Sequence, residues 1–169
     1  MGQNKALLRW RGATLLEYVA VEVEAAAGSV AIVGGEGLSG FRYVADEVAG
    51  VGPLGGITAA LADTRAERNL IVACDMPGVT RGWLERLLAD AEQDVTVPVT
   101  ADGRMHPLCA VWRRGAASSV RGALESGVHS VQEVVRALQY RLFAVENEAT
   151  IANVNTPEEW AHFTRRGRE

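Results

Sequence analysis

The chain has 169 residues, of which 48% are hydrophobic and 22% are charged, and its formal net charge is -4. This length gives one domain with its own hydrophobic core and is too short for two ordinary domains. A net negative charge provides no basic footprint, so we expect no nucleic-acid partner. Cys74 and Cys109 lie in apolar runs, and no such run approaches the roughly 20 residues that span a bilayer. We therefore expect buried, reduced thiols, no membrane partner and a cytoplasmic location.

Helical and strand-like patterns alternate along the chain. In chain order, we expect helix 14–26, strands 29–33 and 42–45, helix 54–68, strand 69–74, helix 80–91, strands 94–99 and 108–112, helices 116–125 and 130–138, strand 140–145 and helix 157–165. The first helix has Thr14 as its cap and Glu17 as the partner in a capping box. Residues 69–74 form the clearest buried strand, with polar residues only at its edge.

This alternation predicts an α/β fold with a Rossmann-like, doubly wound, mostly parallel sheet and helices on both faces. We expect a single domain over residues 1–165 and a frayed tail at residues 166–169. Sheets of this kind bind ligands at the carboxyl ends of their strands. Side chains that directly follow a predicted strand, such as Asp46 and Asp75, are therefore the first candidates for a site.

Asp75 ends the most apolar predicted strand, in the run Cys74-Asp75-Met76-Pro77. A carboxylate at this edge can hold Mg²⁺ against substrate phosphates, because this ion is usually bound by one or two carboxylates together with phosphate oxygens. An Asp at the same place is also typical of a residue that caps the turn before a helix. Its position alone leaves both interpretations open.

A glycine-rich junction and one lysine are the next candidates. In Gly52-Pro53-Leu54-Gly55-Gly56, the proline suits the first turn of a helix, and the glycines let the backbone approach a flat base or a sugar. The same residues also fit a plain junction between a loop and a helix. Lys5 follows Gly2 closely and can hold a phosphate as a point charge, while a solvated lysine has the same signature.

Two asparagines precede the last predicted helix. If this segment is extended, Asn153 and Asn155 point to the same side, where their amides can donate to and accept from a polar ligand. Thr156 and Pro157 are ordinary signals of a helix start, so both interpretations can hold together. His106 precedes a predicted strand and can either touch a ligand or be solvated.

Taken in order, these pieces resemble the molybdenum cofactor guanylyltransferases. The matching stretches run nearly the whole chain and are Met1-Gly2 with Lys5, Asp46 before Gly52-Pro53-Leu54, Cys74-Asp75-Met76-Pro77, His106-Pro107-Leu108 and Asn153-Val154-Asn155-Thr156-Pro157-Glu158. The same set fits relatives such as the cytidylyltransferase that acts on the same pterin. The resemblance implies a fold like that of the nucleotide-diphospho-sugar transferases. It also implies a Mg²⁺-dependent reaction in which GTP gives GMP to molybdopterin and pyrophosphate is released.

The resemblance also implies roles for single residues. Lys5 and Asp75 would be catalytic, with Lys5 on the triphosphate and Asp75 binding Mg²⁺ near the α-phosphate. The nucleotide-binding residues would be Gly2, Lys5, Asp46, Gly52, Pro53, Leu54 and Asp75. Asn153 and Asn155 would lie on the pterin side or near the reaction centre. GTP and molybdopterin would be the substrates, and molybdoenzyme chaperones or other cofactor-assembly proteins would be the protein partners.

Two departures from the family pattern bear on these expectations. Family members carry a strand, then Leu-Ala-Gly-Gly and then Arg-Met-Gly, of which only Met1-Gly2 is present here. The absent strand would be central, and each buried backbone group left unpaired costs about 1–3 kcal/mol. We therefore expect the natural start about 15–20 residues upstream, the length of a strand and a loop. Family members also carry an Asn after strand 29–33, where Gly34-Gly35 stands here. This difference weakens the assignment of guanine as the base relative to cytosine.

Two further functions fit the same residues. The missing loop favours a truncated, inactive domain that only binds a partner protein, and calorimetric titration with GTP and Mg²⁺ separates it from an active transferase. A transferase with another acceptor, such as a sugar 1-phosphate, keeps the chemistry. The run Asn153-Val154-Asn155-Thr156-Pro157 favours the pterin acceptor, by resemblance only.

Overall fold

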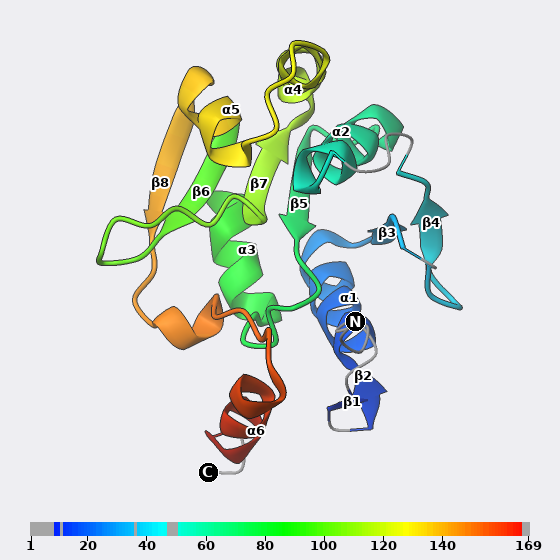
Figure 1. Cartoon of the computed structure of the whole chain (residues 1–169), viewed down its shortest axis with the longest axis vertical. Helices are drawn as coiled ribbons and strands as arrows, with labels where there is room; N and C mark the ends of the chain where they lie inside the picture. Colours follow the sequence, from blue (N-terminus) through cyan, green and yellow to red (C-terminus); the bar gives the residue numbers. More distant parts are fainter. Residues whose placement is uncertain (1–8, 11, 36, 47–50, 167–169) are drawn as a thin grey trace.

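The computed structural model describes residues 9–10, 12–35, 37–46 and 51–166. The strands of this part form three sheets (Figure 1). The largest has the order β5-β7-β6-β8, with β5 at Arg68–Val72, β7 at Cys109–Arg113, β6 at Val95–Val99 and β8 at Tyr140–Ala144. The two smaller sheets pair β3 at Ala31–Val33 with β4 at Arg42–Val44, and β1 at Arg9–Trp10 with β2 at Ala13–Thr14.

The helices connect and cover these strands. They are α1 at Leu15–Ala27, α2 at Pro53–Asp63, α3 at Arg81–Ala89, α4 at Ala117–Glu125, α5 at Val131–Ala137 and α6 at Pro157–Arg166, with short 3-10 turns η2 at Arg114–Ala116 and η3 at Glu148–Thr150. None of the helices in this described part is both long and apolar enough to cross a membrane. Because α6 runs to Arg166 and residues 167–169 lie outside the described part, the predicted tail stays a prediction.

Two hydrophobic clusters lie on opposite faces of the four-stranded sheet. Cys109 and Val111 of β7 belong to the cluster that contains α1 and α3 side chains. Ala110 and Trp112 of the same strand belong to the cluster that contains side chains of α2, α4 and α5. Successive residues of a strand point to opposite faces, so a single strand supplies both cores. The expected doubly wound α/β arrangement, with helices on both faces, is confirmed.

β7 gives the four-stranded sheet its mixed pattern. It runs antiparallel to both β5 and β6, whereas β8 is parallel to β6. Residues 100–108 join β6 to β7, and a parallel crossover needs about a dozen residues or more, usually with a helix. The short loop, which turns at Gly103 with a φ of 82°, therefore brings the chain back antiparallel. The expected parallel direction is shared by β5, β6 and β8, and β7 is the exception.

β5 is less buried than the strands beside it. β6 and β7 are buried almost throughout, whereas β5 runs from exposed at Arg68 to half-buried at Val72. The expectation that residues 69–74 form the clearest buried strand is therefore wrong. The reason is that β5 ends its sheet, and only its β7 edge pairs with a strand of the described residues. The central strand expected upstream of Met1 stays a prediction.

The first helix begins as its sequence predicts. Thr14 Oγ1 accepts a hydrogen bond from the Glu17 N–H at 3.2 Å, and Glu17 Oε2 accepts from the Thr14 N–H at 2.6 Å. This reciprocal pair is the capping box, and it satisfies two backbone donors at the start of α1. The helix ends at Gly28, whose left-handed φ of 80° suits a residue without a Cβ.

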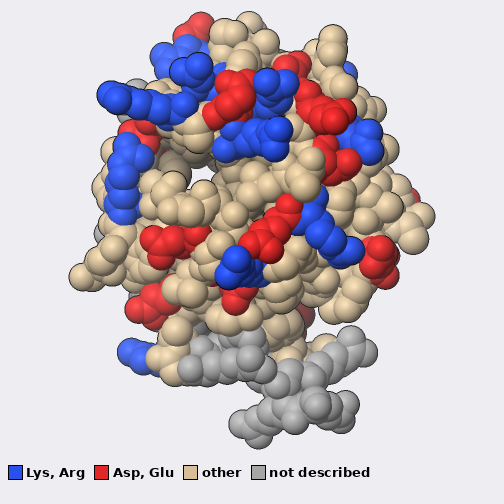
Figure 2. Space-filling view, turned by 180° about the vertical axis from the view of Figure 1, so that it is seen from behind, with Lys and Arg blue, Asp and Glu red and all other residues tan. Residues whose placement is uncertain are grey.

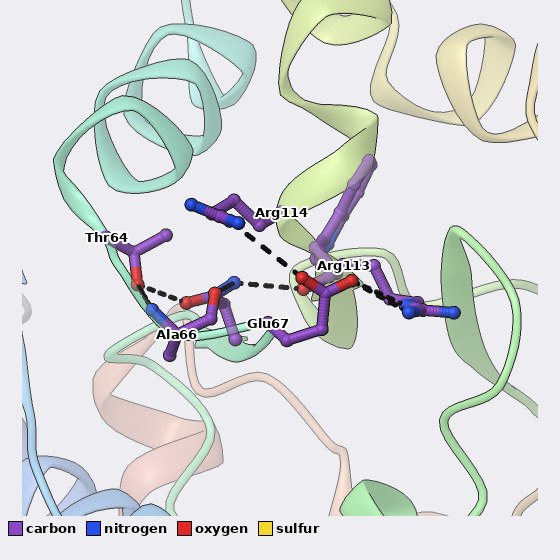
Figure 3. Close-up of polar contacts among 7 residues, drawn as sticks. Thr64, Ala66, Glu67, Arg113 and Arg114 are labelled. Atoms are coloured by element: carbon purple, nitrogen blue, oxygen red, sulfur yellow. Dashed lines mark hydrogen bonds and ion pairs between the residues drawn. The ribbon is translucent and has the colours of Figure 1, made fainter.

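The helix predicted over residues 54–68 ends early, at Asp63. The Thr64 hydroxyl donates to Asn69 Oδ1 at 2.6 Å, and Asn69 Nδ2 donates to the Trp112 carbonyl at 3.2 Å. Such local bonds offer the chain an alternative to continuing a helix. They also join the loop before β5 to the end of β7, as the close-up in Figure 3 shows.

Charged side chains of both signs are interspersed on the face seen in Figure 2. Several of the described charges are paired, including Arg42 with Asp63, Arg113 with Glu67 and Arg141 with Asp90. These pairs are exposed or half-exposed, so each contributes little to stability by itself. Their main effect is local neutralisation of charge.

Candidate active site at the carboxyl ends of the strands

Asp75 lies in the turn that follows β5. The pairing of β5 with the chain before β7 continues one step beyond Val72, because the Ala73 N–H donates to the Leu108 carbonyl at 2.7 Å. The chain then turns at Cys74 and Asp75, which leaves Asp75 half-buried. The structure thus places this carboxylate at the edge of the sheet where α/β folds bind their ligands.

The segment after η3 returns to Asp75 from 78 residues further along the chain. Asn153 Nδ2 donates to Asp75 Oδ1 at 3.2 Å, and the Val154 N–H donates to the Asp75 carbonyl at 2.8 Å. Ile151 and Val154 anchor this segment, since they are only 1% and 3% exposed. The structure therefore brings together Asp75 and Asn153, which the sequence pointed to separately.

Asn155 lies at the entry to α6 and is exposed. The N–H groups of Asn155 and Thr156 both donate to Glu159 Oε2, at 2.6 Å and 3.1 Å. The Glu159 N–H donates back to Thr156 Oγ1 at 3.1 Å, which completes a capping box. The helix-start interpretation is therefore correct from Thr156 onward, while Asn153, just before it, contacts Asp75.

Gly78 belongs to the same region and was not singled out from the sequence. A Cβ on Gly78 would lie 2.0 Å from the Ala149 carbonyl oxygen and 2.9 Å from that of Thr150. No side chain fits into this space, so the loop after β5 meets η3 backbone to backbone. A glycine after Pro77 is an ordinary turn signal. No local pattern reveals a contact with a segment that distant in sequence.

The second group of expected site residues surrounds the start of α2. Gly52 is the N-cap with a left-handed φ of 71°, and Pro53 opens the helix, as its fixed φ predicts. Asp46 packs against this first turn, with Oδ1 only 2.9 Å from the position of a Cβ on Gly55. A carboxylate beside the first turn also suits the positive end of the helix. Leu54 shapes the turn from the core side, because its side chain is fully buried.

An open cavity of about 620 Å³ lies beside this turn, between β4, α2 and α4. Asp46 and Gly55 line it together with Arg121 and Glu125 of α4. Asp75 and Asn153 are not part of its lining. Within the described residues, the expected site residues therefore form two groups, one around Asp46 and one around Asp75.

Asp75 has no Lys or Arg side chain within ion-pair distance among the residues that the structure describes. Its carboxylate is held by the neutral amide of Asn153 and keeps acceptor capacity for a cation. In the described ranges, no three His, Cys, Asp or Glu side chains are grouped to hold a metal. Mg²⁺ does not require such a group, because it is usually bound by one or two carboxylates together with oxygens of the substrate phosphates. Gly2 and Lys5, the expected phosphate contacts, lie outside the described residues.

His106 and Cys109 lie where β7 begins. The His106 N–H donates to the Pro98 carbonyl at 2.9 Å. Burial, with a smaller contribution from the charge of Arg104, lowers the pKa of His106 and favours the neutral imidazole. His106 Nε2 is buried without a hydrogen-bond partner in the described part of the chain. Burial also raises the pKa of the Cys109 thiol to about 12, so this cysteine is an unreactive core residue.

Comparison with known proteins shows which family this arrangement comes from. Residues 1–143 match the model of the MobA-like NTP transferase domain. The chain belongs to the MobA-like NTP transferase family. It is 33% identical over 173 residues to the molybdenum cofactor guanylyltransferase of Xanthomonas euvesicatoria pv. vesicatoria, covering 96% of this chain and 87% of that protein. The resemblance inferred from the motifs is confirmed.

Solved structures share the fold. Molybdopterin-guanine dinucleotide biosynthesis protein A from Archaeoglobus fulgidus superposes with a TM-score of 0.78 at 23% identity, covering 99% of this chain and 92% of that one. The 2-C-methyl-D-erythritol 4-phosphate cytidylyltransferase from Thermus thermophilus superposes with a TM-score of 0.77 at 21% identity, covering 98% and 94%. The expected nucleotidyltransferase-like α/β fold is confirmed.

Proposed function

We propose that this member of the MobA-like NTP transferase family transfers GMP from GTP to molybdopterin and releases pyrophosphate. The observation that carries the proposal is the hydrogen bond between Asn153 and Asp75. It joins a carboxylate suited to a phosphate-bound cation with the segment that resembles the pterin side of the family. The name of the Xanthomonas relative supports the same reaction.

The proposed chemistry is a displacement at phosphorus. An oxygen of the terminal phosphate of molybdopterin attacks the α-phosphorus of GTP, the bond from that phosphorus to the bridging oxygen breaks, and pyrophosphate leaves. Mg²⁺, when bound, neutralises charge on the phosphates. Asp75 would hold that ion through its carboxylate, and Lys5 would add a positive charge at the triphosphate. Positioning and charge neutralisation supply most of the rate enhancement in such reactions.

The start of α2 would bind the nucleoside part of GTP. Gly52 has no side chain and a left-handed backbone, so a sugar or base can approach the turn closely. Pro53 and Leu54 would hold the turn in shape, and Asp46 would offer a carboxylate to hydroxyl or amino donors of the nucleotide. The cavity beside Asp46 gives this group access to solvent.

Cytosine is the alternative base. Gly34 and Gly35 follow β3 with φ values of 72° and 64°, at the place where family members carry an Asn. Without an amide side chain, this position can recognise a base only through its backbone. A CTP-dependent molybdopterin cytidylyltransferase is therefore the second candidate.

The test is product formation from molybdopterin, Mg²⁺ and either GTP or CTP, followed by pyrophosphate release and by the mass of the dinucleotide product. We expect the guanine dinucleotide as the main product, with GTP preferred over CTP. A preference for CTP would assign the protein to the alternative base. Failure with both nucleotides, together with capture of a cofactor-assembly protein, would favour the inactive partner-binding domain.

The proposal includes several features that follow from the same reaction. Mg²⁺ would be the cofactor, and the cytoplasm, where GTP is available, would be the location. Molybdoenzyme chaperones or other cofactor-assembly proteins would be the protein partners, because the dinucleotide product must be passed on.

A further inference from the structure

The loop after β5, residues 73–79, and the C-terminal segment, residues 147–155, are joined at three places. The Asn153 amide donates to the Asp75 carboxylate at 3.2 Å, and the Val154 N–H donates to the Asp75 carbonyl at 2.8 Å. At Gly78 the two backbones are so close that a Cβ would lie 2.0 Å from the Ala149 carbonyl oxygen. The contacts therefore fix both the main chain and the side chain of Asp75.

The C-terminal segment is itself held firmly. The Asn147 side chain accepts a hydrogen bond from the Ala149 N–H at 3.1 Å, which orders the start of η3. Ile151 is 1% exposed and packs in the same core cluster as Met76 and Val79 of the opposing loop. Because both segments share this apolar contact, a displacement of one moves the other.

The Asn153 amide acts on only one of the two Asp75 oxygens. The hydrogen bond goes to Oδ1, and no described residue gives Oδ2 a hydrogen bond or an ion pair. The amide thereby selects the rotation of the carboxylate and leaves Oδ2 for a cation. A hydrogen bond to a ligating carboxylate commonly changes metal affinity or activity about 10–100-fold.

We infer that Asn153 and Gly78 are positioning residues, which hold Asp75 in the orientation that binds a divalent cation and couple that cation site to the C-terminal segment. This inference rests on the proposed function, since it takes Asp75 as the cation ligand. It differs from the expected role of Asn153 on the pterin side, because the contact that the structure gives its side chain is with Asp75. A ligand that shifts the C-terminal segment would change cation affinity at Asp75.

The test measures Mn²⁺ binding to the protein in the absence of molybdopterin, by the electron paramagnetic resonance signal of free Mn²⁺ at a fixed GTP concentration. A protein-free sample with the same GTP and Mn²⁺ is the reference, because GTP binds Mn²⁺ by itself. No turnover is needed for this readout. The variants are Asn153→Leu, which keeps the size and removes the donor, and Gly78→Ala, which adds a Cβ where the Ala149 carbonyl lies. Gly82→Ala is the matched control, because a Cβ there has nothing within 4 Å. Asp75→Ala reports on the cation site itself.

We expect Asn153→Leu and Gly78→Ala each to weaken Mn²⁺ binding about tenfold, with Gly82→Ala unchanged and Asp75→Ala losing the site. Circular dichroism and thermal unfolding check that each variant is folded. If Gly78→Ala fails to fold, Asn153→Leu still decides, because its side chain is exposed.

Wild-type affinity in Asn153→Leu, with binding lost in Asp75→Ala, would overturn the positioning role and leave the proposed function standing. Wild-type affinity in Asp75→Ala would overturn the metal role of Asp75, and the positioning role would fall with it. The two failures therefore have different signatures.

Discussion

The two ends of strand β5 carry carboxylates with different surroundings. Glu67, at the amino end, lies beside two arginines, whereas Asp75, at the carboxyl end, accepts a hydrogen bond from one neutral amide. Glu67 Oε1 accepts from Arg113 at 2.7 Å and 3.1 Å, while Glu67 Oε2 lies 3.8 Å from Arg114 Nε (Figure 3). Asp75 accepts from the Asn153 amide and has no described cationic partner. Glu67 has its charge balanced within the protein, whereas Asp75 has charge to offer a ligand. We therefore call the Glu67 end of β5 the structural end and the Asp75 end the reaction end.

The largest expected effect is at the reaction end. Asp75→Asn removes the charge and keeps the size, so we expect turnover of GTP to fall about 100–1000-fold, the usual cost of losing one charge-stabilising group. The free energy of unfolding should stay within about 0.5 kcal/mol, as for most substitutions at partly exposed positions. Pyrophosphate release and thermal unfolding measure the two quantities. Glu67→Gln is the control and should turn over GTP like the wild type.

The next effect belongs to the structural end. Asn69→Ala removes the donor to the Trp112 carbonyl and the acceptor for the Thr64 hydroxyl. Polar groups left without partners there cost about 1–2 kcal/mol in the free energy of unfolding. Urea unfolding measures this loss, and GTP turnover at a temperature where the variant is folded should be unchanged. A loss of GTP turnover with an unchanged free energy of unfolding would contradict the purely structural role of this end of β5.

A smaller effect is expected for the ion pairs of the structural end. Glu67 and Arg113 have side chains that are 52% and 38% exposed. Exposed pairs contribute about 0.2–1 kcal/mol, so Glu67→Gln should lower the free energy of unfolding by no more than that. The difference from the wild type should shrink in about 1 M salt, because salt screens exposed charges. A loss that is equally large at high salt would show that packing, and not charge, dominates here.

The smallest effect concerns pH at the reaction end. Burial, followed by the charge of Arg104, lowers the pKa of His106, while Asp102 and Glu148 act in the opposite direction. The unfolded chain therefore binds a proton more readily than the folded protein does. The contribution of neutral His106 to the free energy of unfolding is therefore fully present above the ordinary histidine pKa of about 6.5. This contribution is lost as the pH falls below that value. The wild type should lose more thermal stability than His106→Gln between about pH 7.5 and pH 5.5, and equal losses would contradict this.

Local patterns in the sequence were enough for most of the framework. The capping box of Thr14 and Glu17 and the opening of α2 by Pro53 depend only on neighbouring residues, and both are present. The antiparallel direction of β7 also follows from its short connection to β6. The expectation of a mostly parallel sheet did not take this connection into account. The early end of α2 was missed because Thr64 and Asn69 compete with the helix through side-chain bonds.

The candidate site could be predicted only in part. The place of Asp75 at a strand end follows from the alternation of helices and strands. Two contacts join segments that are far apart in sequence. They are the hydrogen bond between Asp75 and Asn153 and the close approach of the Gly78 backbone to Ala149. No periodicity or local motif carries such a pairing, because it depends on how η3 packs on the core through Ile151.

The most direct test of the account is the place where a divalent cation binds. With Mn²⁺ and GTP added to isotope-labelled protein, paramagnetic broadening of backbone amide signals reports which end of β5 is close to the ion. We predict that the signals of residues 73–79 and 153–154 broaden most, that those of Glu67, Arg113 and Arg114 stay sharp, and that Asp75→Asn abolishes the effect. Broadening centred on the Glu67 end, or unchanged by Asp75→Asn, would contradict the assignment of Asp75 as the cation ligand.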